Sequence, residues 1–390
     1  MDEIFDIFQK KYNFEKRKVL GKGGFGVVRE IKMKDKIYAA KLVKKDAKKD
    51  TEKGSINETE ENNIILFLHN PNIVKIFRIY QETYDNALTK ETEIYNLIIM
   101  EKSHLKDLKT FIRYLYNHNS DIINNAFSEI IGDNFLRLFV KQIINGLEIL
   151  ERNELIHFDI KPQNILIFIE LSLKLSDFGL LREVYKKDNI IIPGGTPGYL
   201  SPDYFKHKRH RIPVEDAKKQ DYFALGATIY LLKYNQKMIK VENFKRANKT
   251  EENILNQEYI VDSIPKIITK IQSNRECDRD FVNFLCSLIQ IVPEDRPIFE
   301  EIFRNKWVNK NRKYISEIVN GFSKVEETYL IKELRKSDFL IEKKQEKQEK
   351  QEKQKENTKK NKFNFKFNKN KAKINSISNS ISTNTTNKNL

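Results

Sequence analysis

Short runs rich in apolar and β-branched residues occur along much of the first hundred residues, which predicts a small region rich in strands. These strand patterns lie at residues 14–20, 37–43, 72–80 and 95–100. A polar connection over 81–93 separates the last two patterns. One helical pattern, at 59–68, ends at the stop signal His69-Asn70-Pro71.

A helical stripe of apolar positions runs from Phe135 to Arg152, after an inserted loop over 117–134. The alternating run 171–175 predicts a short strand.

Four side chains suited to phosphoryl transfer lie within the eight residues from His157 to Asn164. The carboxylate of Asp159 can accept a hydroxyl proton, and the ammonium of Lys161 can neutralise charge on a moving phosphoryl group. The amide oxygen of Asn164 can ligate Mg²⁺. Asp159 and Lys161 are two residues apart, so in an extended segment they point to the same side.

This segment, together with Asp177-Phe178-Gly179, resembles the catalytic loop and metal-binding segment of eukaryotic protein kinases. The usual patterns there are H-R-D-L-x-x-x-x-N and D-F-G. The resemblance covers about residues 14–307 and implies an α+β fold of two lobes. The N-lobe would be small and rich in strands with one helix, and the C-lobe would be larger and mainly helical. The implied segments are a lead 1–13, N-lobe and hinge 14–102, C-lobe 103–307, an amphipathic helical extension 308–341 and a low-complexity, disordered tail 342–390.

A glycine loop and a strand lysine are the expected contacts to the phosphates of ATP. Glycines let a hairpin close over phosphate oxygens and present N–H groups to them. Lys41 lies in an apolar strand pattern, where an unpaired ammonium is unfavourable, and the kinase pattern V-A-I-K implies that it holds the α- and β-phosphates. The loop residues assigned to nucleotide binding are Gly21, Lys22, Gly23, Gly24, Phe25 and Gly26.

The resemblance also implies a helix carboxylate that pairs with Lys41. Counting back from Pro71 favours Glu61, and Glu58 is the alternative. In the metal site, Asn164 and Asp177 would hold Mg²⁺.

Further residues are assigned to the nucleotide through the same resemblance. Met100 would be the gatekeeper, followed by the hinge residues Glu101, Lys102 and Ser103. Asp107 would contact ribose hydroxyls or a basic substrate residue, and a solvated surface aspartate is an equally good interpretation. The residues expected to sandwich the adenine are Val28, Ala39 and Leu166. Those expected to stack as an apolar column between the lobes are Ile65, Ile76, His157 and Phe178.

The segment from Gly195 to Asp203 resembles G-T-P-x-Y-x-x-P-E, with wording closest to calmodulin-dependent-type kinases. Thr196 would hydrogen-bond Asp159 and Lys161, which implies serine or threonine substrates. Asp203 replaces the usual glutamate and would pair with Arg296. A buried helix aspartate, Asp221, would brace the catalytic loop.

Phe158 is the main departure from the family pattern. Most regulated kinases have an arginine here, which pairs with a phosphorylated residue of the activation loop. Between Gly179 and Gly195 there is also no serine or threonine, and Tyr185 is the sole hydroxyl. We therefore expect activity without activation-loop phosphorylation.

Charge and composition change this picture little. Residues 342–390 contain 14 Lys and 5 Glu and so account for more than half of the formal net charge of +16. We expect this tail to be unstructured and solubilising, and contact with anionic surfaces is the alternative. The two cysteines, Cys277 and Cys286, have no metal or redox spacing and are expected to be core thiols on a helix. No leader or membrane-spanning pattern is present, which predicts a cytoplasmic protein, with a nuclear location also open.

The sequence thus predicts a monomeric protein serine/threonine kinase that uses ATP and Mg²⁺ on protein substrates. Asp159 would be the catalytic base, helped by Lys161, Asn164 and Thr196. The alternative from another class is a pseudokinase, a scaffold on the same fold. A calmodulin-like regulator binding residues 308–341 is a further alternative, although Glu317, Glu326 and Glu327 dilute the basic face.

Overall fold

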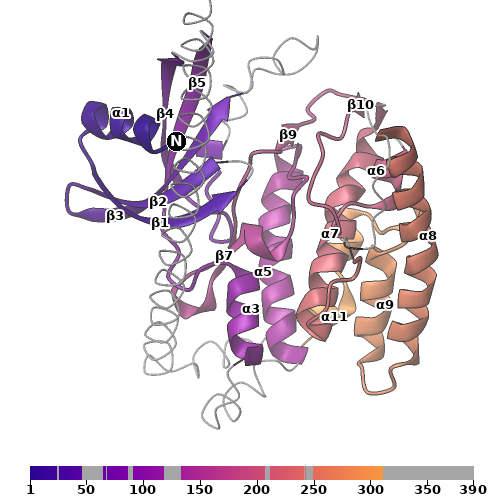
Figure 1. Cartoon of the computed structure of the whole chain (residues 1–390). Helices are drawn as coiled ribbons and strands as arrows, with labels where there is room; N and C mark the ends of the chain where they lie inside the picture. Colours follow the sequence, from indigo (N-terminus) through magenta and orange to yellow (C-terminus); the bar gives the residue numbers. More distant parts are fainter. Residues whose placement is uncertain are drawn as a thin grey trace, which may run out of the picture. The chain divides into compact units, whose positions relative to one another are not determined.

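The computed structural model (Figure 1) describes residues 1–23, 26–45, 65–66, 68–86, 91–117, 133–206, 211–240, 242 and 249–310. All of them belong to the first of two compact units, Met1–Glu327, and the second unit, Thr328–Leu390, lies outside the described residues. The extension and the tail therefore remain sequence predictions.

Five antiparallel strands form a sheet in the order β1-β2-β3-β5-β4. The strands are β1 (Glu15–Gly23), β2 (Gly26–Met33), β3 (Lys36–Lys45), β4 (Ile76–Asp85) and β5 (Thr92–Met100). The predicted polar connection over 81–93 is too long, because β4 and β5 continue through most of it. Its polar side chains pair across the hairpin, as where Glu82 lies opposite Tyr95.

Alternation along β3 gives the sheet two different faces. Ala40 and Leu42 are fully buried in an apolar cluster on one face. Ala39 and Lys41 necessarily point to the other face, where Lys41 reaches Asp177. We call the face of Ala40 and Leu42 the outer face, and that of Lys41 the inner face.

The N-terminal lead is a helix, α1 (Asp2–Tyr12), that covers the outer face of the sheet. Its apolar residues Ile4, Phe5 and Phe8 lie one helical turn or less apart and are buried in the outer-face cluster. Left-handed Asn13 ends the helix and turns the chain into β1. The sequence predicts this segment only as a lead over 1–13, without a packed helix.

The remaining described elements form a mainly helical part, as Figure 1 shows. Its helices are α3 (Leu108–Asn117), α5 (Asp133–Arg152), α6 (Pro202–Lys206), α7 (Val214–Tyr234), α8 (Lys249–Ser273), α9 (Arg279–Leu288), α10 (Phe299–Phe303) and α11 (Lys306–Asn309). None of the helices in the described ranges is long and apolar enough to cross a membrane.

Three short strand pairs and several tight turns carry the loops of the helical part. The pairs are β6 (Leu155–Ile156) with β9 (Arg182–Glu183), β7 (Ile165–Ile167) with β8 (Leu173–Leu175), and β10 (Asn189–Ile190) with β11 (Ile212–Pro213). The 3₁₀ turns are η2 (Pro162–Asn164), η3 (Ile169–Leu171) and η5 (Pro293–Asp295).

The helical core closes around Trp307 of α11, which is fully buried against Phe281 and Phe284 of α9. Cys286 lies on α9, whereas Cys277 precedes that helix, so the prediction that both thiols share a helix is wrong. Both cysteines are buried and free.

The short segment just before β4 connects the two parts of the fold. Ile73 forms a parallel bridge with Leu175 of β8, and Asn72 donates through its amide nitrogen to the carbonyl oxygen of Leu173 at 2.8 Å. Asn72 is buried, so these hydrogen bonds are shielded from water. The sheet is thereby tied directly to the strand that precedes Asp177.

Candidate active site

The loop that carries Asp159 is held from behind by a buried carboxylate on α7. Asp221 accepts hydrogen bonds from the backbone N–H groups of His157 and Phe158, at 2.8 and 2.9 Å. Burial raises the pKa of Asp221 to about 7, although these two N–H donors act to lower it. Phe158 adopts a left-handed conformation, with φ of 62°, which turns the chain sharply before Asp159.

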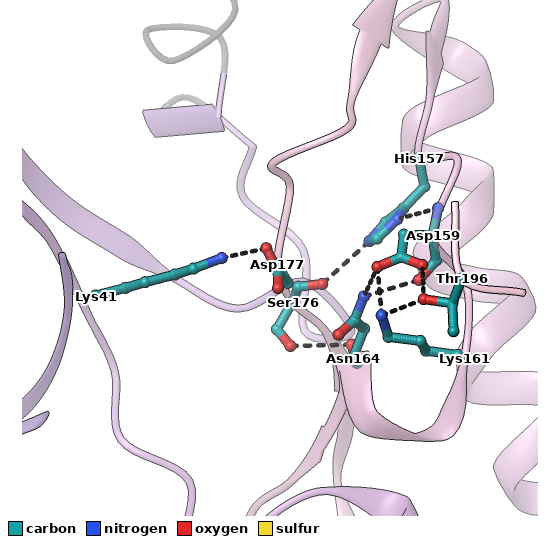
Figure 2. A network of polar contacts seen from close by, with 8 residues as sticks. All are labelled: Lys41, His157, Asp159, Lys161, Asn164, Ser176, Asp177 and Thr196. Atoms are coloured by element: carbon teal, nitrogen blue, oxygen red, sulfur yellow. Dashed lines mark hydrogen bonds and ion pairs between the residues drawn. The ribbon is translucent and has the colours of Figure 1, made fainter. Parts of the chain in front are cut away.

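Asp159 is the centre of a dense network of hydrogen bonds (Figure 2). Its Oδ1 accepts from the Thr196 hydroxyl at 2.6 Å, and its Oδ2 accepts from Lys161 Nζ at 2.6 Å. Asn164 Nδ2 donates to the same Oδ2 and to the Asp159 backbone carbonyl, each at 2.8 Å. Lys161 also donates to the Thr196 hydroxyl at 2.5 Å. One carboxylate is therefore fixed by three side chains from two segments.

His157 is fully buried and connects the loop to the segment before Asp177. Its Nδ1 accepts from the Asp159 N–H at 3.2 Å, and its Nε2 donates to the Ser176 carbonyl at 3.1 Å. Burial lowers the pKa of His157, outweighing the nearby carboxylates. The ring stacks obliquely on Phe178, with centroids 5.4 Å apart. His157 thus packs against Phe178 and orients the catalytic loop, and its imidazole is neutral.

Lys41 on the inner face of the sheet forms an ion pair with Asp177 Oδ1 (Figure 2). Burial alone would raise the pKa of Asp177, but the charge and the hydrogen bond of Lys41 more than offset burial, so that pKa lies below its ordinary value. Asp177 has a left-handed backbone, with φ of 61°, which directs its side chain towards Lys41. The positive charge on β3 and the negative charge after β8 therefore lie next to each other.

The donor atoms fit a hard divalent cation such as Mg²⁺. Asn164 uses its amide nitrogen for Asp159, which turns its carbonyl oxygen away from that residue. No residue in the described ranges donates a hydrogen bond to Asn164 Oδ1 or Asp177 Oδ2. A carboxylate and an amide oxygen are ligand types that Mg²⁺ accepts, with water and phosphate oxygens completing its shell.

The residues assigned to the adenine sandwich come from both parts of the fold. In the sheet, Val28 lies opposite Lys41, and Ala39 lies opposite Met100, so all four side chains share the inner face. Leu166 lies in β7, beside Asp107 through an isolated bridge. The gatekeeper assignment of Met100 is compatible with this register, since Ile99 belongs to the outer-face cluster.

Side chains of the hinge act as braces. Glu101 accepts two hydrogen bonds from Lys174 Nζ of β8, at 2.8 and 2.9 Å, and one from the Lys75 N–H. Lys102 pairs with Glu30 of β2 at 2.9 Å. Within the described residues, no hydrogen bond engages the backbone groups of Ser103, so this part of the hinge backbone can bind a ligand.

Asp107 caps helix α3. Its Oδ1 accepts from the Thr110 N–H at 2.9 Å, and its Oδ2 accepts from the Thr110 hydroxyl at 2.7 Å. A capping carboxylate stabilises the first turn of a helix. These contacts give Asp107 a structural role as a cap, and its assignment to a ligand stays a prediction.

The glycine loop is described in part. Gly21, Lys22 and Gly23 end β1, and the structure does not describe Gly24 and Phe25. Gly26 has φ of +133°, and a Cβ atom there would lie 2.0 Å from the carbonyl oxygen of Leu42. Glycine at 26 is thus required by close packing on β3. Glu61 and Glu58 also lie outside the described residues.

Sequence reasoning missed three polar residues that support the site, namely Ser176, Glu30 and Gln220. Ser176 donates twice to the Asn164 carbonyl, and Glu30 braces the hinge. Gln220 of α7 accepts from the N–H and hydroxyl of Ser201, at 3.1 and 2.7 Å, and so holds the segment after Thr196. The polar pair Gln220 and Asp221 directly before the apolar run that begins at Tyr222 is the pattern that could have revealed it.

Known proteins show similarity over most of this chain. The family model described as "Protein kinase domain" matches residues 14–308. G protein-coupled receptor kinase 4 of Mus musculus is 29% identical over 308 residues, which cover 75% of this chain and 47% of the relative. NUAK family SNF1-like kinase 1 of Homo sapiens is 25% identical over 302 residues, 77% of this chain and 39% of the relative.

A third relative is matched along more of its own length. Serine/threonine-protein kinase 17A of Oryctolagus cuniculus is 26% identical over 314 residues, 78% of this chain and 68% of the relative. The match spans less than half the length of the first two relatives.

Proposed function

Because the chain belongs to the protein kinase family, we propose that it transfers the γ-phosphoryl group of ATP to serine or threonine hydroxyls of protein substrates. The observation that carries the proposal is the network on Asp159, in which Lys161 and Thr196 fix both carboxylate oxygens. The names of the relatives, which include a serine/threonine-protein kinase, support the acceptor class.

In this mechanism the acceptor hydroxyl lies against Asp159. Its oxygen forms a bond to the γ-phosphorus, the bond to the bridging oxygen of ADP breaks, and Asp159 takes the proton. Lys161 stabilises the negative charge on the transferred group, and Lys41 holds the α- and β-phosphates. Asn164 and Asp177 would hold Mg²⁺, which neutralises phosphate charge when it is bound. Positioning and electrostatic stabilisation supply most of the rate.

The remaining assignments concern the nucleotide. The loop from Gly21 to Gly26 would cover the phosphates, with Glu61 supporting Lys41. Val28, Ala39 and Leu166 would enclose the adenine below the gatekeeper Met100, and the backbone from Glu101 to Ser103 would bind its edge. For Asp107 a role as the cap of α3 accounts for both of its oxygens.

The test of this function is phosphate transfer from labelled ATP to matched peptides with serine, threonine or tyrosine as acceptor. We expect transfer to serine and threonine, and a fall of about 10²–10⁴-fold in kcat for Asp159→Asn. Asp177→Asn should lose magnesium-dependent turnover. Nucleotide binding without transfer to any acceptor would instead support the pseudokinase alternative.

We also propose that phosphorylation of the activation segment is not required. Phe158 lies in a buried apolar cluster with Leu180, Val184, Ile190, Ile192, Ile212 and Val214. Two short strand pairs, β6 with β9 and β10 with β11, hold the same segment. Apolar packing thus supports the segment at the position where an arginine–phosphate pair would otherwise act.

Phosphatase-treated protein from bacteria, verified by intact mass, tests this second proposal. Its initial rate should match that of untreated protein, and Tyr185→Phe should behave the same. An inactive dephosphorylated enzyme that regains activity on modification of Tyr185, which is 56% exposed, would overturn the proposal.

A further inference from the structure

Helix α3 places its first turns beside the catalytic loop. The helix packs against η2, which contains Asn164, and against β7. Asp107, the cap of α3, forms a bridge with Leu166. The first turn of this helix is therefore close to the loop on which a protein substrate would lie.

Two cations lie on one side of α3. Lys109 and Arg113 are four residues apart, so their side chains are neighbours on the helix surface. Arg113 is exposed and Lys109 is half-buried. Neither side chain forms a hydrogen bond or an ion pair with another residue in the part of the chain that the structure describes.

Further cations surround this pair. Burial lowers the pKa of Lys109, and the like charges of Arg113, Lys237 and Lys161 lower it further, whereas Asp107 raises it. Lys237 follows α7, and Lys161 contacts Asp159 and Thr196 directly. The positive charges thus extend from α3 to the predicted catalytic base.

The acidic residues near these cations each contact another side chain. Both oxygens of Asp107 accept from Thr110. Glu242 lies 3.7 Å from Lys237, and both side chains are more than half exposed, so this ion pair is weak. In the catalytic loop, the residue between Pro162 and Asn164 is the neutral Gln163.

We infer that this surface selects serine or threonine acceptors that are flanked by acidic side chains. A groove lined by charges of one sign attracts the opposite charge and disfavours its own. A basic flank would be repelled by Lys109 and Arg113. The inference rests on the proposed function and names the substrate class of that site.

The experiment compares peptides that share one acceptor serine and differ in their flanks. Four peptides carry glutamate, phosphoserine, alanine or lysine flanks, each placed on the N-terminal side in one set and on the C-terminal side in another. Two exposed charge contacts predict about two- to thirtyfold higher kcat/KM for the glutamate flank than for alanine, on one side of the serine. The preference should shrink with added salt, because exposed charges are screened. The phosphoserine arm shows whether a phosphate can supply the same charge.

Variants at Lys109 and Arg113 separate recognition from stability. The double variant Lys109→Gln/Arg113→Gln should lose most of the preference and retain its rate on the alanine peptide. The charge reversal Lys109→Glu/Arg113→Glu should favour the lysine flank. Lys266→Gln, at an exposed position of α8, is the matched control and should retain the acidic preference.

The outcomes distinguish this inference from the function beneath it. Transfer to the alanine peptide with equal or better use of the lysine flank would overturn the acidic preference and leave the kinase assignment standing. An acidic preference that survives in both double variants would overturn the role of α3. Failure to phosphorylate every peptide would overturn the proposed function itself.

Discussion

Buried charges in this molecule are held by partners on distant elements. Arg296, with a fully buried side chain, pairs with Asp203 Oδ1 of α6 and donates to the carbonyl oxygens of Gln290 and Ile291. Asp203 Oδ2 is buried and has no hydrogen-bond partner among the described residues. A side chain shorter than the usual glutamate thus leaves one carboxylate oxygen unsatisfied.

Two substitutions of Asp203 should therefore differ in their effect on the free energy of unfolding. Asp203→Ala leaves a buried guanidinium without its counter-charge and should lower the free energy of unfolding by about 3–5 kcal/mol. Asp203→Glu should be neutral or stabilising, because the longer side chain can direct both oxygens at Arg296. Urea unfolding followed by the fluorescence of Trp307 measures both. A loss below about 1 kcal/mol for the alanine variant would contradict this account.

His157 gives a pH dependence whose sign follows from its burial. Its pKa is lower in the folded protein than the ordinary value of about 6.5. The unfolded state therefore takes up a proton that the folded state does not, so this contribution to stability is complete above about pH 6.5 and is lost as the pH falls below it. The free energy of unfolding should therefore fall between pH 7.5 and 5.5 through this group.

The comparison variant is His157→Phe, which retains a ring next to Phe178 and removes the titration. Its unfolding free energy should fall less between pH 7.5 and 5.5 than that of the wild type. His69→Gln, at an exposed position, is the control and should follow the wild type. Parallel pH profiles for all three proteins would exclude His157 as the source.

At the scale of elements, α1 is part of the fold of the sheet. Phe5 and Phe8 are fully buried against β-strand residues such as Leu42 and Leu97. Ion pairs at its surface, such as Asp2 with Arg29, add contacts between helix and sheet. The family match begins at residue 14, so the helix lies before the matched domain.

Truncating one of these rings should therefore destabilise the protein. Phe8→Ala should lower the free energy of unfolding by about 3–5 kcal/mol through lost burial and the cavity that remains. Lys10→Ala, on the exposed side of the same helix, should change it by less than about 0.5 kcal/mol. Urea denaturation with far-UV circular dichroism measures both. Equal stability of the two variants would mean that α1 does not contribute to the folded core.

How far the elements could be predicted depended on the kind of evidence in the sequence. Periodicity located β3 and α5, because each has a clear buried face. It failed over residues 81–93, since Glu82 and Glu93 occupy strands through pairing with Tyr12, Tyr95 and Lys44. Pairing with a distant side chain leaves no periodic trace in the sequence.

The residues of the site divide in the same way, into those found from local motifs and those that act through distant contacts. Short-range motifs identified Asp159, Lys161, Asn164 and Thr196, which the structure brings into one network. Asp107 stays ambiguous, because the same carboxylate can cap a helix, as its contacts with Thr110 show, and also contact a ligand. Glu30 and Gln220 were missed, since each acts on a segment far away in the chain.

At the scale of the whole described molecule, a few polar contacts couple the sheet to the helices. Asn72 bonds to Leu173 and Gln142, Lys41 pairs with Asp177, and Glu101 pairs with Lys174. These contacts make the stability of the sheet depend on that of the helical part. We expect the two parts to unfold together.

Asn72→Ala should weaken this coupling. Removing a buried donor leaves the Leu173 carbonyl unsatisfied and should lower stability by about 1–3 kcal/mol. Hydrogen exchange followed by mass spectrometry should give equal opening free energies for β5 and α5 in the wild type, and a lower value for β5 in the variant. Asn274→Ala removes only a local hydrogen bond from the Glu276 N–H at the surface and should leave both values unchanged. A uniform decrease in both elements would show that Asn72 stabilises without coupling.

The hydrocarbon cluster around Phe158 has a consequence for cellular control. Side chains such as Val184 and Ile190 carry no hydroxyl group. An upstream kinase therefore cannot phosphorylate them, and a phosphatase has nothing to remove. If the activation segment is permanently supported in this way, output cannot be set by covalent marking of that segment. We then expect control to act outside that segment, and the amount of the protein in the cell is one quantity through which it can act.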